Sequence, residues 1–224
     1  MTGIHDVAIE SGERLLPGRL WSGTRDPEPR RILFVHGYQT SQTRYAPRAQ
    51  SASDHLAAIC LTFDLSGHGR DAARSPSYAV SDHLDDIIAG YDHLAKLPPA
   101  SSARIGVCGS SYGAYLAALL TEHRSVKRLV LRAPPLASGM AAILGLASPH
   151  GLPDSLAILS RYTGDTLIIE SELDVVVPHD HVAAYLASKS KAHHMVIPGA
   201  THALTDPAWD KIFVGGTIEW FRGL

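Results

Sequence analysis

The stretch VCGSSYGAYLA, Val107–Ala117, joins a short apolar run to an alanine-rich helical pattern. It contains the pattern G-x-S-x-G, in which Ser111 stands between Gly109 and Gly113. A serine on a sharp strand-to-helix turn has a strained backbone, and glycine two residues away on each side removes the steric clash. Of the two adjacent serines only Ser111 has both glycines, so the pattern selects it over Ser110 as the candidate nucleophile. By itself the pattern also suits a plain structural turn. Residues elsewhere in the sequence are needed to distinguish a catalytic serine from such a turn.

Short apolar runs recur along the chain on both sides of this stretch. Because they do not alternate with polar residues, they are typical of strands buried on both faces. The runs lie at residues 31–35, 58–63, 104–108, 128–131, 166–169 and 194–197.

Helical patterns separate most of these runs, with apolar residues spaced three and four apart. They cover residues 81–97, 111–123, 179–188 and 208–221, the last weakened by Gly215-Gly216. Alternating strands and helices predict an α/β fold, with a mostly parallel sheet and helices on both faces. The opening segments DVAIES and RLLPGRLW predict two antiparallel strands joined by a turn at Ser11-Gly12.

The length of 224 residues favours one domain over residues 1–224. Residues 136–164 form a long connection between two predicted strands, rich in Ala, Gly, Ser, Leu and Pro. Long connections in compact domains are often lids, so we expect a small lid or cap insertion here, or else a ragged crossover helix.

A serine nucleophile needs a base, and the base needs a carboxylate that orients it. His202, in VIPGATHALTD, follows the last predicted strand, and Asp174, in LIIESELDVVVPHD, follows the strand before it. Both positions can reach the sheet edge at which Ser111 lies. The carboxylate is the least certain member, because four other acidic residues lie nearby: Glu170, Glu172, Asp180 and Asp206.

Four motifs together resemble the α/β-hydrolase superfamily, and they span nearly the whole chain. They are FVHGY at Phe34–Tyr38, FDLSGHGRD at Phe63–Asp71, GSSYG at Gly109–Gly113, and LDVVVP followed later by GATH. The order Ser, Asp, His is that of this superfamily. The spacing is most similar to small bacterial esterases, including the serine aminopeptidase-like and the cinnamoyl or feruloyl esterase-like branch. Relatives commonly have glycine three residues before the acid, where this chain has Ser171.

The resemblance implies an eight-stranded sheet and a Ser111–His202–Asp174 catalytic triad. It also implies an oxyanion hole made by two backbone N–H groups, those of Tyr38 and Tyr112. We expect a serine esterase that cleaves small to medium carboxylic esters through an acyl-enzyme, with activity falling below about pH 6 as the base becomes protonated. A peptidase, amidase or thioesterase with the same triad is an alternative, as is a non-catalytic ligand-binding protein. The substrate-binding residues are not predicted.

The amino-acid composition argues against several other classes of function. The net charge is -2, with 45% hydrophobic and 19% charged residues, so no basic excess points to nucleic acid. The two cysteines lie in apolar runs and are predicted to be reduced and buried. We expect no metal at His179/His181 or His193/His194, no cofactor, no signal peptide and no membrane span, hence a cytoplasmic protein. The partner is a small-molecule ester, and the oligomeric state is unknown.

Overall fold

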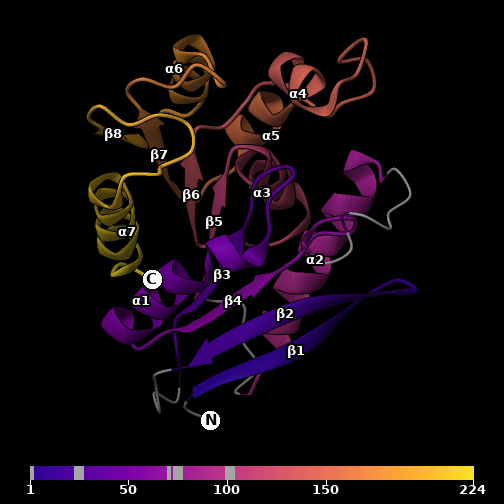
Figure 1. Ribbon diagram of the computed structural model, residues 1–224, viewed down its shortest axis with the longest axis vertical. Helices are drawn as coiled ribbons and strands as arrows, with labels where there is room; N and C mark the ends of the chain where they lie inside the picture. Colours follow the sequence, from indigo (N-terminus) through magenta and orange to yellow (C-terminus); the bar gives the residue numbers. More distant parts are fainter. Residues whose placement is uncertain (1–2, 23–27, 70–71, 73–77, 99–103) are drawn as a thin grey trace.

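The computed structural model describes residues 3–22, 28–69, 72, 78–98 and 104–224. Its centre is one eight-stranded sheet with the order β1-β2-β4-β3-β5-β6-β7-β8 (Figure 1). The pairs β1–β2 and β2–β4 are antiparallel, and all other neighbouring strands are parallel. The strands are β1 Gly3–Ser11, β2 Arg14–Ser22, β3 Arg31–Val35, β4 Ile59–Phe63, β5 Ile105–Ser110, β6 Arg128–Arg132, β7 Asp165–Ser171 and β8 Ala192–Ile197.

Helices cover both faces of the sheet, as expected for a parallel sheet whose strands are apolar on both sides. The helices α1 and α7 pack on one face, around a core that includes Phe34 and Phe213. The helices α2, α3 and α6 pack on the other face, around a core that includes Leu33 and Tyr115. The helices are η1 Gln42–Arg44, α1 Ala46–Leu56, α2 Val80–Lys96, α3 Tyr112–His123, α4 Ala137–Leu144, α5 Ser155–Arg161, α6 His179–Ser188 and α7 Pro207–Phe221.

The predicted α/β-hydrolase architecture is confirmed, with all six predicted strands and the antiparallel opening pair in place. The prediction that all six are buried is wrong for β8, which lies at the edge of the sheet and is largely exposed. Two further details differ from the sequence pattern. Helix α1 was not predicted, since its buried face is made of small or polar residues such as Ala49, Ala52 and Ser53. Helix α7 continues through Gly215-Gly216 without a break. At Gly216 a Cβ would collide with the Met195 side chain, so glycine allows the close approach of α7 to β8.

The connection at residues 136–164 holds two short helices, α4 and α5. Hydrogen bonds tie it to the helices beneath it: Tyr115 Oη donates to Pro153 O at 2.7 Å, and the Ser155 and Tyr185 hydroxyls lie 2.6 Å apart. Its role as a lid stays a prediction. Among the described residues, no helix combines the length and the apolar character that a bilayer crossing needs.

Candidate active site

The turn between β5 and α3 has the geometry that its glycines predicted. Ser111 has φ 54° and ψ −122°, a left-handed conformation that is unusual for a residue other than glycine. A Cβ at Gly109 would overlap the backbone of Gly113, and a Cβ at Gly113 would overlap the carbonyl groups of Val35 and His36. The crowding around Ser111 therefore comes from its own turn and from the end of β3. Such strain persists only where the surrounding structure holds it in place, and it is frequent at functional sites.

The three residues predicted as a triad lie in contact at the carboxyl ends of β5, β7 and β8. His202 Nε2 lies 3.1 Å from Ser111 Oγ, and His202 Nδ1 lies 2.7 Å from Asp174 Oδ2. These residues are 91 and 28 positions apart in the sequence. The parallel sheet places the loops after its strands along one edge, and so brings a serine, a histidine and a carboxylate into one line.

The Asp174 carboxylate is nearly fully buried, with 3% of its side chain exposed. Burial alone would raise the pKa of Asp174, but hydrogen bonds from His202 and from the N–H groups of Val177 and Val176 outweigh it and bring the pKa below its ordinary value. Asp174 is therefore ionised at neutral pH, and its Oδ2 accepts a hydrogen bond from His202 Nδ1–H. The other ring nitrogen of His202, Nε2, faces the Ser111 hydroxyl.

The other acidic residues near Asp174 have different partners. Glu170 pairs with His179 and His194, and Glu172 accepts from Gly199 N–H. Asp206 caps the N-terminus of α7, and Asp180 lies in the first turn of α6. Of the five candidates, Asp174 is the one that the structure brings to His202.

The loop after β3 lies directly against the nucleophile. A Cβ on Gly37 would lie 3.6 Å from Ser111 Cβ. The Gly37 carbonyl accepts hydrogen bonds from His36 Nδ1 at 2.8 Å and Thr40 Oγ1 at 2.9 Å. Because a trans peptide directs its C=O and the next N–H in opposite directions, Tyr38 N–H points away from His36 and Thr40. Tyr112 N–H, at the first position of α3, has no acceptor within its own helix.

A buried hydrogen bond between Tyr112 and His83 was not predicted from the sequence. Tyr112 Oη lies 2.6 Å from His83 Nδ1, and His83 Nε2 lies 2.9 Å from Ser66 O. Burial raises the pKa of Tyr112 and lowers the pKa of His83. Both groups are therefore neutral: His83 Nε2–H donates to Ser66, and Tyr112 Oη–H donates to His83 Nδ1. The residue after the nucleophile is thus tied to α2 through its side chain.

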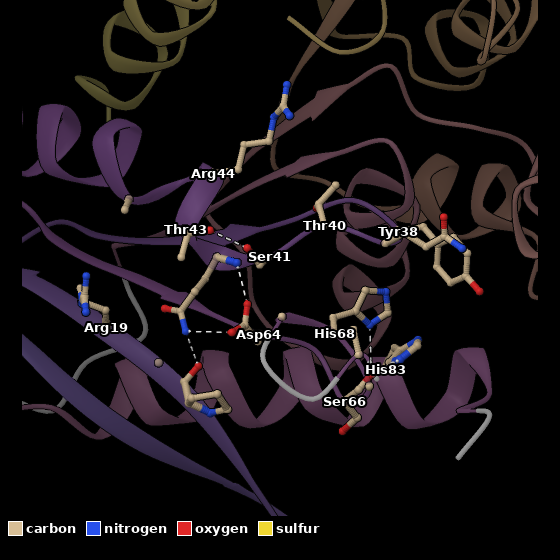
Figure 2. Close-up of a pocket in the computed structure, with 18 of the residues that line it drawn as sticks. Arg19, Tyr38, Thr40, Ser41, Thr43, Arg44, Asp64, Ser66, His68 and His83 are labelled. Atoms are coloured by element: carbon tan, nitrogen blue, oxygen red, sulfur yellow. Dashed lines mark hydrogen bonds between the residues drawn. The ribbon is translucent and has the colours of Figure 1, made fainter. Parts of the chain in front are cut away.

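A cavity of about 1150 Å³ opens beside the loop after β3, between that loop and β2 (Figure 2). Its lining includes Tyr38, Arg44, His68 and His83, but of the described residues around it neither Ser111 nor His202 contributes. Arg44 contacts Ala203 O, next to His202, so the rim of the cavity meets the loop that carries the histidine.

The histidine pairs considered as metal ligands have separate partners. His179 contacts Glu170, while His181 Nδ1 accepts from Leu136 N–H. The His193 ring contacts the Trp220 ring at a tilt of 60°, and His194 contacts Glu170. No group of three or more His, Cys, Asp or Glu within the described ranges is arranged to hold a metal ion.

A protein-family comparison matches residues 27–161 to the family described as "Serine aminopeptidase, S33". The matched range contains Tyr38 and Ser111 and ends before Asp174 and His202.

Solved structures of hydrolases are similar over nearly the whole chain. Est1E from Butyrivibrio proteoclasticus, solved with ferulic acid, is 20% identical with a TM-score of 0.80, covering 95% of this chain and 96% of its own. The esterase Pf2001 from Pyrococcus furiosus is 21% identical with a TM-score of 0.76, covering 99% of this chain and 93% of its own. A predicted CIB-like hydrolase from Thermoplasma acidophilum is 18% identical with a TM-score of 0.74, covering both chains completely. At these identities the likeness shows the α/β-hydrolase fold.

Among curated proteins, a Mycobacterium tuberculosis protein named "Putative phosphoribosyl transferase" is 26% identical over 220 residues. The match covers 96% of this chain and 45% of that protein. This chain therefore spans about half the length of the curated relatives it matches.

Proposed function

Since this chain belongs to the serine aminopeptidase S33 family and has the α/β-hydrolase fold, we propose that it is a serine hydrolase that cleaves small to medium carboxylic esters. The observation that carries the proposal is the continuous contact from Asp174 through His202 to Ser111, at 2.7 and 3.1 Å. A strained turn and a buried, ionised carboxylate are what a nucleophilic serine requires, and a plain structural turn requires neither.

The proposed reaction has two steps. His202 Nε2 takes the proton of Ser111 Oγ as that oxygen attacks the ester carbonyl carbon, and Asp174 stabilises the imidazolium that forms. His202 then gives the proton to the departing alcohol, which leaves Ser111 acylated. A water molecule, deprotonated by His202, attacks the acyl group and releases the acid, and the proton returns to Ser111.

The negative charge that develops on the carbonyl oxygen needs donors in place beforehand. We assign this role to Tyr112 N–H, at the start of α3, and to Tyr38 N–H. The two hydrogen bonds that hold the Gly37 carbonyl support the assignment of Tyr38, because they fix the orientation of that peptide. The positive end of the α3 dipole adds to the stabilisation. One such donor typically contributes about 3–4 kcal/mol to the transition state.

A fluorophosphonate probe tests the proposal, since it forms a covalent bond with an activated serine. We expect the intact protein to be labelled, S111A to be unlabelled, and S110A to be labelled as well as wild type. S110A is a matched control because Ser110 is the adjacent, buried serine with the same side chain. Absence of labelling of the wild type, or equal labelling of S111A, would reject a serine hydrolase and favour a ligand-binding protein.

Substrate panels separate the enzymatic alternatives that share this triad. Turnover of p-nitrophenyl esters of increasing acyl length, of methyl ferulate, of acyl thioesters and of aminoacyl anilides should be compared on one preparation. We expect the highest kcat/KM on the oxygen esters. Preference for the anilides would indicate a peptidase or amidase, and preference for the thioesters a thioesterase.

A further inference from the structure

Arg132, the last residue of β6, is a cation buried directly behind the candidate triad. Only 4% of the residue is exposed, and among the described residues it has no carboxylate within ion-pair distance. Burial lowers the pKa of Arg132 to about 10, so the guanidinium still carries its charge at neutral pH. A buried charge is costly unless its hydrogen bonds are well satisfied, so the contacts that it makes are informative.

The contacts of Arg132 join the three segments that carry the triad. Its backbone carbonyl accepts from Ser111 N–H at 2.8 Å. Its Nη2 atom donates to Ser171 Oγ at 2.7 Å, at the end of β7 and three residues before Asp174. The same Nη2 contacts the carbonyl oxygens of His202 at 2.5 Å and Thr201 at 3.3 Å.

The Ser171 hydroxyl supplies an acceptor that a glycine at this position would lack. The Ser171 carbonyl also accepts from Asp174 N–H at 3.1 Å. One buried residue therefore connects Arg132 on one side with the turn that carries the acid on the other. The loop that carries His202 has irregular backbone, so it depends on such side-chain contacts for its position.

We propose that Arg132 is a positioning residue, which holds the His202 loop against Ser171 so that both hydrogen bonds of the triad form together. This inference rests on the proposed serine hydrolase function. Arg132 touches neither the reacting atoms nor the cavity beside Tyr38. Its loss should therefore affect the chemical step more than the binding of substrate.

Kinetics of four variants on the best ester test this role. R132M keeps the length of the side chain but removes its donors, and we expect kcat to fall about 100-fold, with KM changed by less than about 3-fold. R132K keeps a charge and a donor and should recover part of kcat. S171G should also lower kcat, and the double variant R132M/S171G should be no worse than R132M, because the two residues act through one contact.

R128M is the matched control, because Arg128 begins the same strand and packs on Trp220, away from the site. It should keep the wild-type kcat. R132M with wild-type kcat, or equal losses of kcat in R128M and R132M, would overturn the proposal. So would additive losses from R132M and S171G.

The position of the loop can also be measured without a substrate. The proton between His202 Nδ1 and Asp174 Oδ2 should give a far-downfield NMR resonance in the wild type, and this resonance should be lost or broadened in R132M but kept in R128M. If the wild type hydrolyses nothing, the proposed function fails while this resonance still tests the positioning role. A resonance that is unchanged in folded R132M would reject that role.

Discussion

At the scale of single residues, Asp174 differs from its neighbouring carboxylates in its contact with His202. We expect D174N to lower kcat by about 10,000-fold, because an amide in that place favours the wrong imidazole tautomer. The measurement is kcat on the best ester, together with the rate of labelling by fluorophosphonate.

E172Q is the matched control for D174N. Glu172 lies two residues away, and its carboxylate accepts from Gly199 N–H and not from the histidine. Its kcat should stay close to that of the wild type. If E172Q lost activity as D174N is expected to, or if D174N kept full activity, Asp174 would not be the orienting carboxylate.

At the scale of secondary-structure elements, the Tyr112–His83 hydrogen bond joins the start of α3 to α2. Y112F removes the hydroxyl and leaves His83 Nδ1 buried without its donor, which should cost between about 1 and 3 kcal/mol of unfolding free energy. The backbone N–H of residue 112 remains, so kcat should fall only several-fold, through a less rigid turn. Denaturant unfolding and kcat on the same sample check both expectations.

Y91F makes the same chemical change at another buried tyrosine of the same face. Tyr91 Oη donates to Ser125 O, on the loop after α3 and away from the nucleophile. Y91F should lose a comparable amount of stability and none of its kcat. A kcat loss of equal size in the two variants would show that general destabilisation explains the effect of Y112F.

At the scale of the whole molecule, buried neutral histidines make stability depend on pH. Burial lowers the pKa of His36 to about 3. Its Nδ1 lies 2.8 Å from Gly37 O, and its Nε2 accepts from Leu65 N–H at 3.0 Å. Below about pH 6.5 the unfolded chain takes up a proton at this residue that the folded protein does not. The unfolding free energy should therefore fall as the pH falls from 7 towards 5, by up to about 1.4 kcal/mol per pH unit for this group.

Urea unfolding of the wild type at several pH values between 5 and 8 measures this dependence. In H36N the slope of unfolding free energy against pH should be shallower, whatever its absolute stability. Burial also lowers the pKa of His83 and His93, so part of the slope should remain. An H36N slope equal to that of the wild type would contradict the assignment of His36 as a neutral group that resists protonation.

Most of the fold could be predicted from local patterns in the sequence. The apolar runs that became β3 to β7 could be recognised because buried parallel strands tolerate few polar residues. Helix α1 escaped prediction because its inward face carries Ala49, Ala52 and Ser53, and thus no apolar periodicity. Small residues allow α1 to approach the sheet closely. They do not produce the periodic pattern of large apolar residues from which a helix is predicted.

The fold class and the candidate nucleophile could be predicted from local sequence patterns, because the steric effect of the glycines around Ser111 and the patterning of the strands act over a few residues. The three-dimensional arrangement was needed to identify which of five carboxylates meets His202, and to find the contacts of Arg132 with the His202 loop and of His83 with Tyr112. Those contacts join residues 28, 70 and 29 positions apart. These contacts depend on the order of the strands and on the lengths of the loops that follow them. Local sequence patterns reflect interactions between neighbouring residues, so they do not reveal which distant residues come into contact.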